Sequence, residues 1–289
     1  MVELTSVPRP DSIGKREFLH DFKQPAVPAV FKTLTASWPA RAHWQPDYLR
    51  KVAGDIIVPL YDSQPSRGRK HQHAPAAYLS LSEYLDRLDF GENNLRLFFF
   101  NFLSAIPELT KDFEYPDIGL KFFRKLPVLF MGGRGSRVQL HFDIDMADII
   151  LAHFGGPKRV ILFPPDQTPY LYRVPFSFSA LFDAGIDPPN YERYPALKQA
   201  RGYVADLEHG DALYIPPGYW HYVKYQDIGF SLSLRAFPRT PANLSRMIYN
   251  LTVVRSIEGL MRKFVGQPWN DRNERRARVK THRALGLPL

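Results

Sequence analysis

Short apolar segments, separated by glycines and prolines, dominate the stretch from Leu95 to Phe237 of this 289-residue chain. The expected strands cover residues 127–131, 138–142, 148–154, 159–163, 211–215 and 229–237. Many short strands with turn residues between them are typical of antiparallel sandwiches and barrels rather than of helical or doubly wound folds. We therefore predict a mainly β fold here, with residues 176–203, rich in proline and aromatics, as an ordered lid or loop.

The segments on either side of this stretch follow other patterns. Before it, residues 48–52 and a segment that starts at Ser82, with this serine as the cap, predict helices, and residues 55–61 predict a strand. After it, apolar residues recur at helical spacing, and a second, very basic helix is expected over 270–284. The apolar stripe consists of Leu244, Met247, Ile248, Leu251, Ile257, Leu260, Met261 and Phe264. We expect residues 1–240 to form the main domain and residues 241–289 a helical extension.

The composition narrows the possible chemistry. The chain has no cysteine, which excludes disulfides, zinc ribbons and thiol catalysis, so any metal must be held by His, Asp or Glu. Because no apolar run could span a bilayer and the N-terminus lacks a secretion signal, we expect a cytoplasmic protein without membrane contact. Residues 255–283 carry nine Lys or Arg against three acids, so this tail holds +6 of the net charge of +9. Such a tail favours a solvated helix face or an acidic partner such as nucleic acid.

One motif carries the chemistry of a metal site. In the sequence His141-Phe-Asp143 the two polar residues are two positions apart, so on a strand they project to the same face. His221 follows a glycine turn, a buried strand and a Pro-Pro-Gly turn, which together deliver a further imidazole from rigid elements. Two histidines and one carboxylate form the facial triad that binds iron(II) and leaves adjacent positions open. We therefore predict His141, Asp143 and His221 to be the metal ligands and the catalytic residues.

Two similar motifs show that such a spacing is weak evidence by itself. His209-Gly-Asp211 repeats it, but the glycine predicts a turn in which the two side chains need not share a face. His71-Gln-His73 lies among Arg, Lys and Pro and is expected to be an exposed loop. The turn and strand that precede His221 therefore decide in favour of the first motif.

Three segments taken together resemble the JmjC-type, cupin-like hydroxylases, including the asparaginyl hydroxylase branch and bacterial cupin-like proteins. These segments are residues 140–143, 158–167 and 210–221. The resemblance implies a double-stranded β-helix (a jelly roll of the cupin type) with flanking N-terminal α/β elements and C-terminal helices. It also implies iron(II), 2-oxoglutarate as co-substrate, and hydroxylation or demethylation of a C–H bond.

The resemblance further implies a cation that binds the distal carboxylate of 2-oxoglutarate. Lys158 opens an expected strand and matches the lysine that has this role in the asparaginyl hydroxylase branch. Arg235 lies in a region where other oxygenase classes place an arginine. Both residues are therefore candidates for the co-substrate anchor.

The sequence also departs from that branch at two co-substrate positions. Where the branch has a tyrosine and a threonine, this chain has Phe98 and Val138, which cannot make the same hydrogen bonds. Asn101, Ser231 or Ser233 are candidates to replace them. These differences leave the predicted iron site intact.

Several functions and one assembly remain open at this stage. The first function is hydroxylation of a protein or peptide side chain with release of succinate and CO2. The second is hydroxylation of an RNA of the tRNA type, motivated by the basic tail and the loop at 66–73. The third, a non-catalytic metal-binding cupin, is disfavoured by the intact triad. The C-terminal stripe must be buried against the barrel or a second copy, and the use of C-terminal helices for dimerisation in the asparaginyl hydroxylase branch favours a homodimer.

Overall fold

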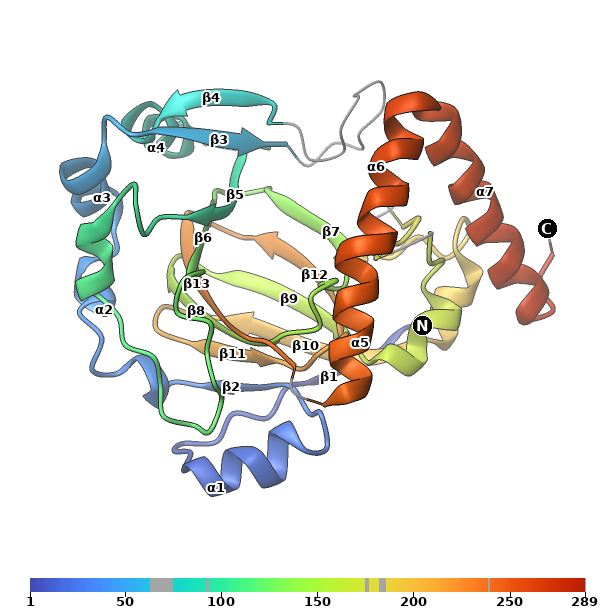
Figure 1. Cartoon of the computed structure of the whole chain (residues 1–289), viewed down its shortest axis with the longest axis horizontal. Helices are drawn as coiled ribbons and strands as arrows, with labels where there is room; N and C mark the ends of the chain where they lie inside the picture. The colour runs from blue at the N-terminus through green and yellow to red at the C-terminus, as the bar shows by residue number, and fades with distance from the viewer. Residues whose placement is uncertain (63–74, 92–93, 175–176, 182–185, 239, 289) are drawn as a thin grey trace.

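The computed structural model describes residues 1–62, 75–91, 94–174, 177–181, 186–238 and 240–288. In this part of the chain the strands form two sheets that share a common interior (Figure 1). The smaller sheet has the order β1 (Glu3–Ser6), β10 (Arg201–Leu207), β9 (Lys158–Phe163), β12 (Trp220–Tyr225) and β7 (Arg137–His141). The larger sheet has the order β2 (Ala29–Phe31), β11 (Ala212–Ile215), β8 (Asp148–Gly155), β13 (Gly229–Ala236), β6 (Val128–Gly132), β5 (Arg96–Asn101), β3 (Ile57–Tyr61) and β4 (Ala77–Ser80).

The centre of both sheets is an antiparallel jelly roll. In the smaller sheet β10, β9, β12 and β7 pair antiparallel, and in the larger sheet β11, β8, β13 and β6 do the same. From β6 onward the chain passes repeatedly from one sheet to the other, which is the double-stranded β-helix arrangement. The mainly β jelly roll predicted from the sequence is therefore confirmed.

One core strand, β10, was not predicted from the sequence because it contains a glycine. It begins inside the segment 176–203, which was predicted to be a lid or loop. Glycine is unfavourable within most strands unless another backbone approaches closely. At Gly202 a Cβ would lie 2.4 Å from the carbonyl oxygen of Leu162 on β9, so glycine is required for this pairing. The same segment contains the 3-10 helix η5 (Pro195–Gln199).

The N-terminal region covers the outer face of the larger sheet. Its helices are α1 (Lys15–Glu17), η1 (Phe18–Lys23), η2 (Thr33–Thr35), α2 (Ala40–His43), α3 (Pro46–Ala53) and α4 (Leu81–Asp89), and 3-10 turns at η3 (Pro107–Lys111) and η4 (Pro165–Tyr170) follow.

The cap of α4 is Ser80 rather than the predicted Ser82. The Ser80 hydroxyl accepts a hydrogen bond from the Glu83 N–H, while the Glu83 carboxylate accepts one from the Ser80 N–H. This reciprocal pair starts the helix two residues earlier than the sequence suggested.

Apolar side chains fill the barrel between the two sheets. Leu151 and Leu213 of the larger sheet meet Val160 and Leu162 of the smaller sheet in one buried cluster. A second cluster joins the outer face of the larger sheet to the N-terminal helices. Because both faces of the larger sheet are covered, its strands are apolar along most of their length, and the inner cluster supports the pocket described below.

The C-terminal region is helical, as predicted, and lies outside the barrel (Figure 1). It consists of α5 (Pro241–Tyr249), the π-helical turn η6 (Asn250–Val254), α6 (Arg255–Phe264) and α7 (Gln267–Ala284). The apolar stripe along α5 and α6 is exposed in the single chain: Ile248 is 52%, Leu260 55% and Phe264 76% exposed. By contrast, α7 turns back and buries Ala277 in a cluster with the smaller sheet. None of the described helices is long and apolar enough to cross a membrane.

Candidate metal centre

Pairing of β7 with β12 brings the two predicted histidine ligands together. His141 is the register partner of His221, and the two imidazole centroids lie 4.2 Å apart. The turn before β12 fixes this register: Gly218 has a φ of +75°, which glycine adopts without strain. β12 is held from its other side by β9, where His221 pairs with Leu162. The imidazoles are therefore positioned by backbone pairing on rigid strands rather than by a loop.

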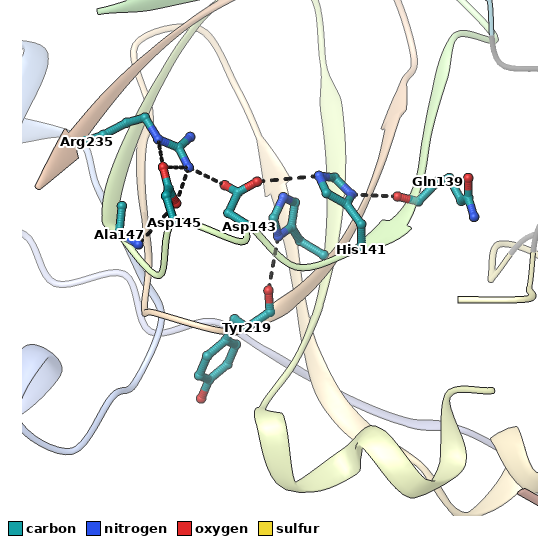
Figure 2. Close-up of polar contacts among 8 residues, drawn as sticks. Gln139, His141, Asp143, Asp145, Ala147, Tyr219 and Arg235 are labelled. Atoms are coloured by element: carbon teal, nitrogen blue, oxygen red, sulfur yellow. Dashed lines mark hydrogen bonds and ion pairs between the residues drawn. The ribbon is translucent and has the colours of Figure 1, made fainter. Parts of the chain in front are cut away.

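Asp143 completes the group just beyond the end of β7. Its Oδ1 lies 3.7 Å from Nε2 of His141. One potential ligand atom from each of His141, Asp143 and His221 lies within 4.8 Å of the other two, and Figure 2 shows the side chains of His141 and Asp143 turned toward each other. Within the described ranges, this is the group of His, Asp or Glu residues that has the geometry to hold a metal ion. Two imidazoles and one carboxylate suit a divalent transition metal.

Backbone carbonyls fix the orientation of both imidazoles. Nδ1 of His141 lies 2.7 Å from the Gln139 carbonyl oxygen, and Nδ1 of His221 lies 3.2 Å from that of Tyr219 (Figure 2). A carbonyl only accepts hydrogen bonds, so each Nδ1 carries the proton and each Nε2 keeps its lone pair. Metal-binding histidines commonly donate their second N–H to such a partner. Both rings are thus held in the tautomer that a metal requires.

Arg235 occupies one of the two carboxylate oxygens of Asp143 and leaves the other free for a metal. Arg235 donates to Oδ2 of Asp143 at 2.8 Å and makes two further 2.8 Å hydrogen bonds to Asp145. Oδ1 of Asp143 is left facing the imidazoles. Burial by itself would raise the pKa of Asp143, but the charge of Arg235, helped by its hydrogen bond to this carboxylate, outweighs burial and holds the pKa of Asp143 well below its usual range. Asp143 is therefore an anion with one oxygen available to a metal.

Asp145 is a functional neighbour that the sequence analysis missed. It continues the alternation begun by His141 and Asp143, which is a signal that was available in the sequence. Its partner Arg235 lies 90 residues further along the chain, however, so the pairing depends on the fold. Arg235 itself is 3% exposed and is neutralised by the two aspartates.

The predicted co-substrate residue Lys158 lies in a pocket between the sheets. This pocket is lined by the three candidate ligands together with Lys158, Tyr225 and Ser233, among others. The Lys158 ammonium group is buried, donates to Ser231 Oγ at 2.8 Å and to the Tyr225 hydroxyl at 3.3 Å, and lies over the Tyr225 ring. Among the described residues no carboxylate forms an ion pair with it, and burial lowers the pKa of Lys158 to about 7.

A buried histidine fixes the hydroxyl that supports Lys158. Nε2 of His153 lies 2.7 Å from the Gly156 carbonyl oxygen and therefore carries the proton, which leaves Nδ1 to accept from Ser231 Oγ at 2.9 Å. Ser231 then has its own oxygen lone pairs turned toward Lys158. Burial, with a smaller contribution from the Lys158 charge, lowers the pKa of His153 to about 3, so this ring is neutral. Lys158 is thus held by a chain of hydrogen bonds that runs through Ser231 and His153 to the Gly156 carbonyl.

The remaining sequence candidates fall into separate places. Phe98 and Val138 line the pocket wall, as their apolar character allows. The Asn101 side chain does not line the pocket. It donates a hydrogen bond to the Lys125 carbonyl and accepts one from the Leu103 N–H. Ser231 supports Lys158 as described.

The second His-x-Asp motif does not form a metal site. Gly210 adopts a φ of +85° in a turn, as the sequence predicted, and the two side chains diverge. His209 contacts the Arg41 carbonyl, whereas Asp211 is buried and pairs with Arg9 at 2.9 Å. The motif at residues 71–73 lies outside the described residues.

Fold and site together define a cupin-type protein with a candidate two-histidine, one-carboxylate metal centre. The sequence profile of the cupin-like domain family matches residues 15–237, from the start of α1 to one residue beyond β13. The chain therefore belongs to the cupin-like, JmjC-type domain family.

Named relatives of the chain include proteins with different substrates. It is 28% identical over 251 residues to the tRNA wybutosine-synthesizing protein 5 of Gallus gallus, with 79% of this chain and 76% of that protein covered. It is 27% identical over 241 residues to the lysine-specific demethylase 8 of Danio rerio, with 78% and 57% covered. It is 27% identical over 243 residues to the Jumonji C domain-containing protein 5 of Drosophila melanogaster, with 78% and 59% covered. The chain thus spans less than two thirds of the last two relatives.

Removal of Arg235 should be far more costly than removal of a surface arginine. In Arg235→Leu two partly buried carboxylates lose the buried cation that they share, and such a loss typically costs about 3–5 kcal/mol. Arg159→Leu removes an arginine of the same barrel whose partner Asp206 is half exposed, which should cost about 1 kcal/mol or less. Denaturant unfolding of both variants measures the difference. Equal destabilisation by the two substitutions would show that the Arg235 cluster does not have the proposed energetic role.

Proposed function

We propose that this protein is an iron(II)- and 2-oxoglutarate-dependent oxygenase that holds its metal through His141, Asp143 and His221. The observation that carries the proposal is the convergence of two Nε2 atoms, fixed in the metal-binding tautomer, with one oxygen of an anionic carboxylate. When bound, iron(II) and 2-oxoglutarate supply the oxidising chemistry that hydroxylates a C–H bond with release of succinate and CO2. A purely structural metal would be closed by four protein ligands, whereas three leave positions open.

We assign the distal carboxylate of 2-oxoglutarate to Lys158 rather than to Arg235. Lys158 is a buried cation in the same pocket, and its hydrogen-bond partners are hydroxyl groups. The distal carboxylate of 2-oxoglutarate would therefore provide an anionic partner for its charge. Arg235 already has two aspartate partners, and its part is to orient Asp143. Ser231 and His153 position the lysine, and the apolar walls at Phe98 and Val138 exclude water from the bound co-substrate.

Two macromolecular substrate classes fit the proposed reaction. Hydroxylation of a protein or peptide side chain is the first, supported by relatives named as lysine-specific demethylases. Hydroxylation of an RNA is the second, supported by a tRNA wybutosine-synthesizing relative and by the basic character of α7. Both classes would reach the pocket past the exposed ring of Phe99, which lies under Arg235.

Loss of one candidate ligand should abolish turnover, whereas loss of the histidine in the second motif should not. In His141→Ala we expect neither stoichiometric Mn(II) binding nor release of succinate from 2-oxoglutarate. In His209→Ala, which changes the other His-x-Asp motif, both should persist, because His209 hydrogen-bonds backbone atoms and packs against the Phe154 ring, outside the pocket. Calorimetry and a succinate assay provide the two measurements. Unchanged turnover in His141→Ala would contradict the assignment.

The Lys158 assignment predicts weaker and pH-dependent binding of 2-oxoglutarate. Lys158→Met keeps the length of the side chain but removes a charge-assisted interaction worth about 1.5–3 kcal/mol, so the dissociation constant should rise roughly ten- to a hundred-fold. The charged form of Lys158 predominates below its pKa of about 7. Above this pH, binding must take up a proton, and the dissociation constant should rise by up to about ten-fold per pH unit.

Calorimetric titrations between about pH 6 and 9, with Mn(II) in place of iron, would measure this dependence in both proteins. The pH dependence should disappear in Lys158→Met. A variant that binds 2-oxoglutarate as tightly as the wild type would place the anchor elsewhere.

We also propose that the exposed stripe on α5 and α6 forms a two-fold homodimer. A helix face with this much exposed apolar surface requires a partner in water, and the described barrel does not cover it. Light scattering should give twice the 33.3 kDa mass of one chain. Leu260→Arg should restore the single-chain mass, whereas Phe90→Arg, which alters an exposed phenylalanine outside the stripe, should not. A single-chain mass for the wild type would reject the dimer.

A further inference from the structure

A large groove lies between α7 and the segment from Thr168 to Val174. Its volume is about 1200 Å³, and its walls come from these two elements alone among the described residues. Six lining residues are cationic and none is acidic. The cations are Arg173, Arg272, Arg275, Arg276, Lys280 and Arg283. Such a concentration of one sign of charge in a concave surface creates a field that attracts polyanions.

The two faces of α7 have different partners. Asn273, Ala277 and Thr281 are buried, which places that face against the rest of the protein. The cations of α7 are exposed and recur from Arg272 to Arg283, a distance of about 16 Å along the helix axis at 1.5 Å per residue. The charges therefore form a row that is too long for a single phosphate group and matches several successive groups along a polymer.

The α7 cations of the groove lack the protein partners that other arginines of this chain have. Arg50 contacts two aspartates and Arg159 contacts Asp206. Within the described residues no ion pair joins a carboxylate to the groove cations of α7, such as Arg276 or Lys280. A row of like charges that the protein itself does not neutralise costs folding stability, and an external anion would relieve that cost.

We propose that this groove binds the phosphate backbone of a polynucleotide. Arginine is well suited to phosphate because its planar guanidinium donates two parallel hydrogen bonds. No aromatic side chain lines the groove within the described residues, so contact is with the backbone and not by base stacking, and recognition is largely independent of sequence. A membrane surface fits less well, because the apolar face of α7 is already buried and the charges lie in a concavity.

The groove is close to the candidate metal centre but separate from it. The guanidinium of Arg173 lies 5.3 Å from the centroid of the Phe142 ring, and Phe142 stands between His141 and Asp143 in the sequence. A polynucleotide backbone bound along α7 would therefore run beside the barrel wall that carries the candidate metal ligands. The binding inference goes beyond the oxygenase proposal and does not depend on metal chemistry.

The test is fluorescence anisotropy of the full chain with a labelled single-stranded RNA of about twenty nucleotides, titrated at several salt concentrations. The groove variant is Arg276→Gln with Lys280→Gln. The matched control is Lys51→Gln with Arg87→Gln, which removes two exposed cations on α3 and α4, at the opposite end of the molecule (Figure 1). Both variants lower the net charge by the same amount.

We expect the wild type to bind with an affinity that falls steeply as salt rises. The groove variant should bind at least about ten-fold more weakly, and the slope of log affinity against log salt should decrease by about 1.4 for two lost phosphate contacts on a single strand. The control should match the wild type. His141→Ala should also bind RNA normally, which separates this inference from the oxygenase proposal.

Any one of the following results would overturn the proposal. If the control variant bound RNA as weakly as the groove variant, the loss of affinity would be a general effect of net charge. If the affinity of the wild type for RNA did not depend on salt, phosphate contacts would not drive binding. If the groove variant bound RNA as tightly as the wild type, the groove cations would make no phosphate contacts. Tighter, groove-dependent binding of polyglutamate or of vesicles containing phosphatidylserine would assign the groove to an acidic protein or to a membrane instead.

Discussion

The candidate site depends on one register, the pairing of His141 on β7 with His221 on β12. Side chains of directly paired residues stand on the same face of a sheet, so this register places two imidazoles side by side. A shift by one residue would turn one ring to the opposite face of the smaller sheet and leave Asp143 with a single histidine. The β7–β12 pairing has an irregularity between His221 and Val223, whereas β9 pairs with β12 without interruption from Trp220 to Tyr225, so β9 holds His221 in place from the other side.

Two buried cations of this pocket have different electrostatic surroundings, and this difference separates their roles. Arg235 is surrounded by Asp143 and Asp145, so it stabilises anions that the protein already contains. Lys158 is surrounded by hydroxyl groups, and its lowered pKa reflects burial without a compensating negative charge. The first cation keeps a candidate metal ligand ionised and oriented. The second is prepared for an anion that comes from outside.

The sequence predicted those features that local patterns encode. Residues two positions apart on a strand share a face, so His141 and Asp143 could be grouped directly, and the Pro-Pro-Gly turn fixed the expected place of His221. Contacts between distant segments were not predictable in this way: Asp145 meets Arg235 only because β13 lies in the same barrel. The strand β10 was missed because its Gly202 is explained only by the close approach of β9. The location of Asn101 likewise depended on a turn contact with Lys125.

Anomalous diffraction from crystals grown with Mn(II) tests the central claim most directly, because it locates the metal and identifies each bonded atom. We predict one metal site per chain, bonded to Nε2 of His141, Nε2 of His221 and Oδ1 of Asp143, with Oδ2 of Asp143 still hydrogen-bonded to Arg235. A metal bonded through either Nδ1 atom, or bound at a different cluster while these three side chains remain without one, would contradict it.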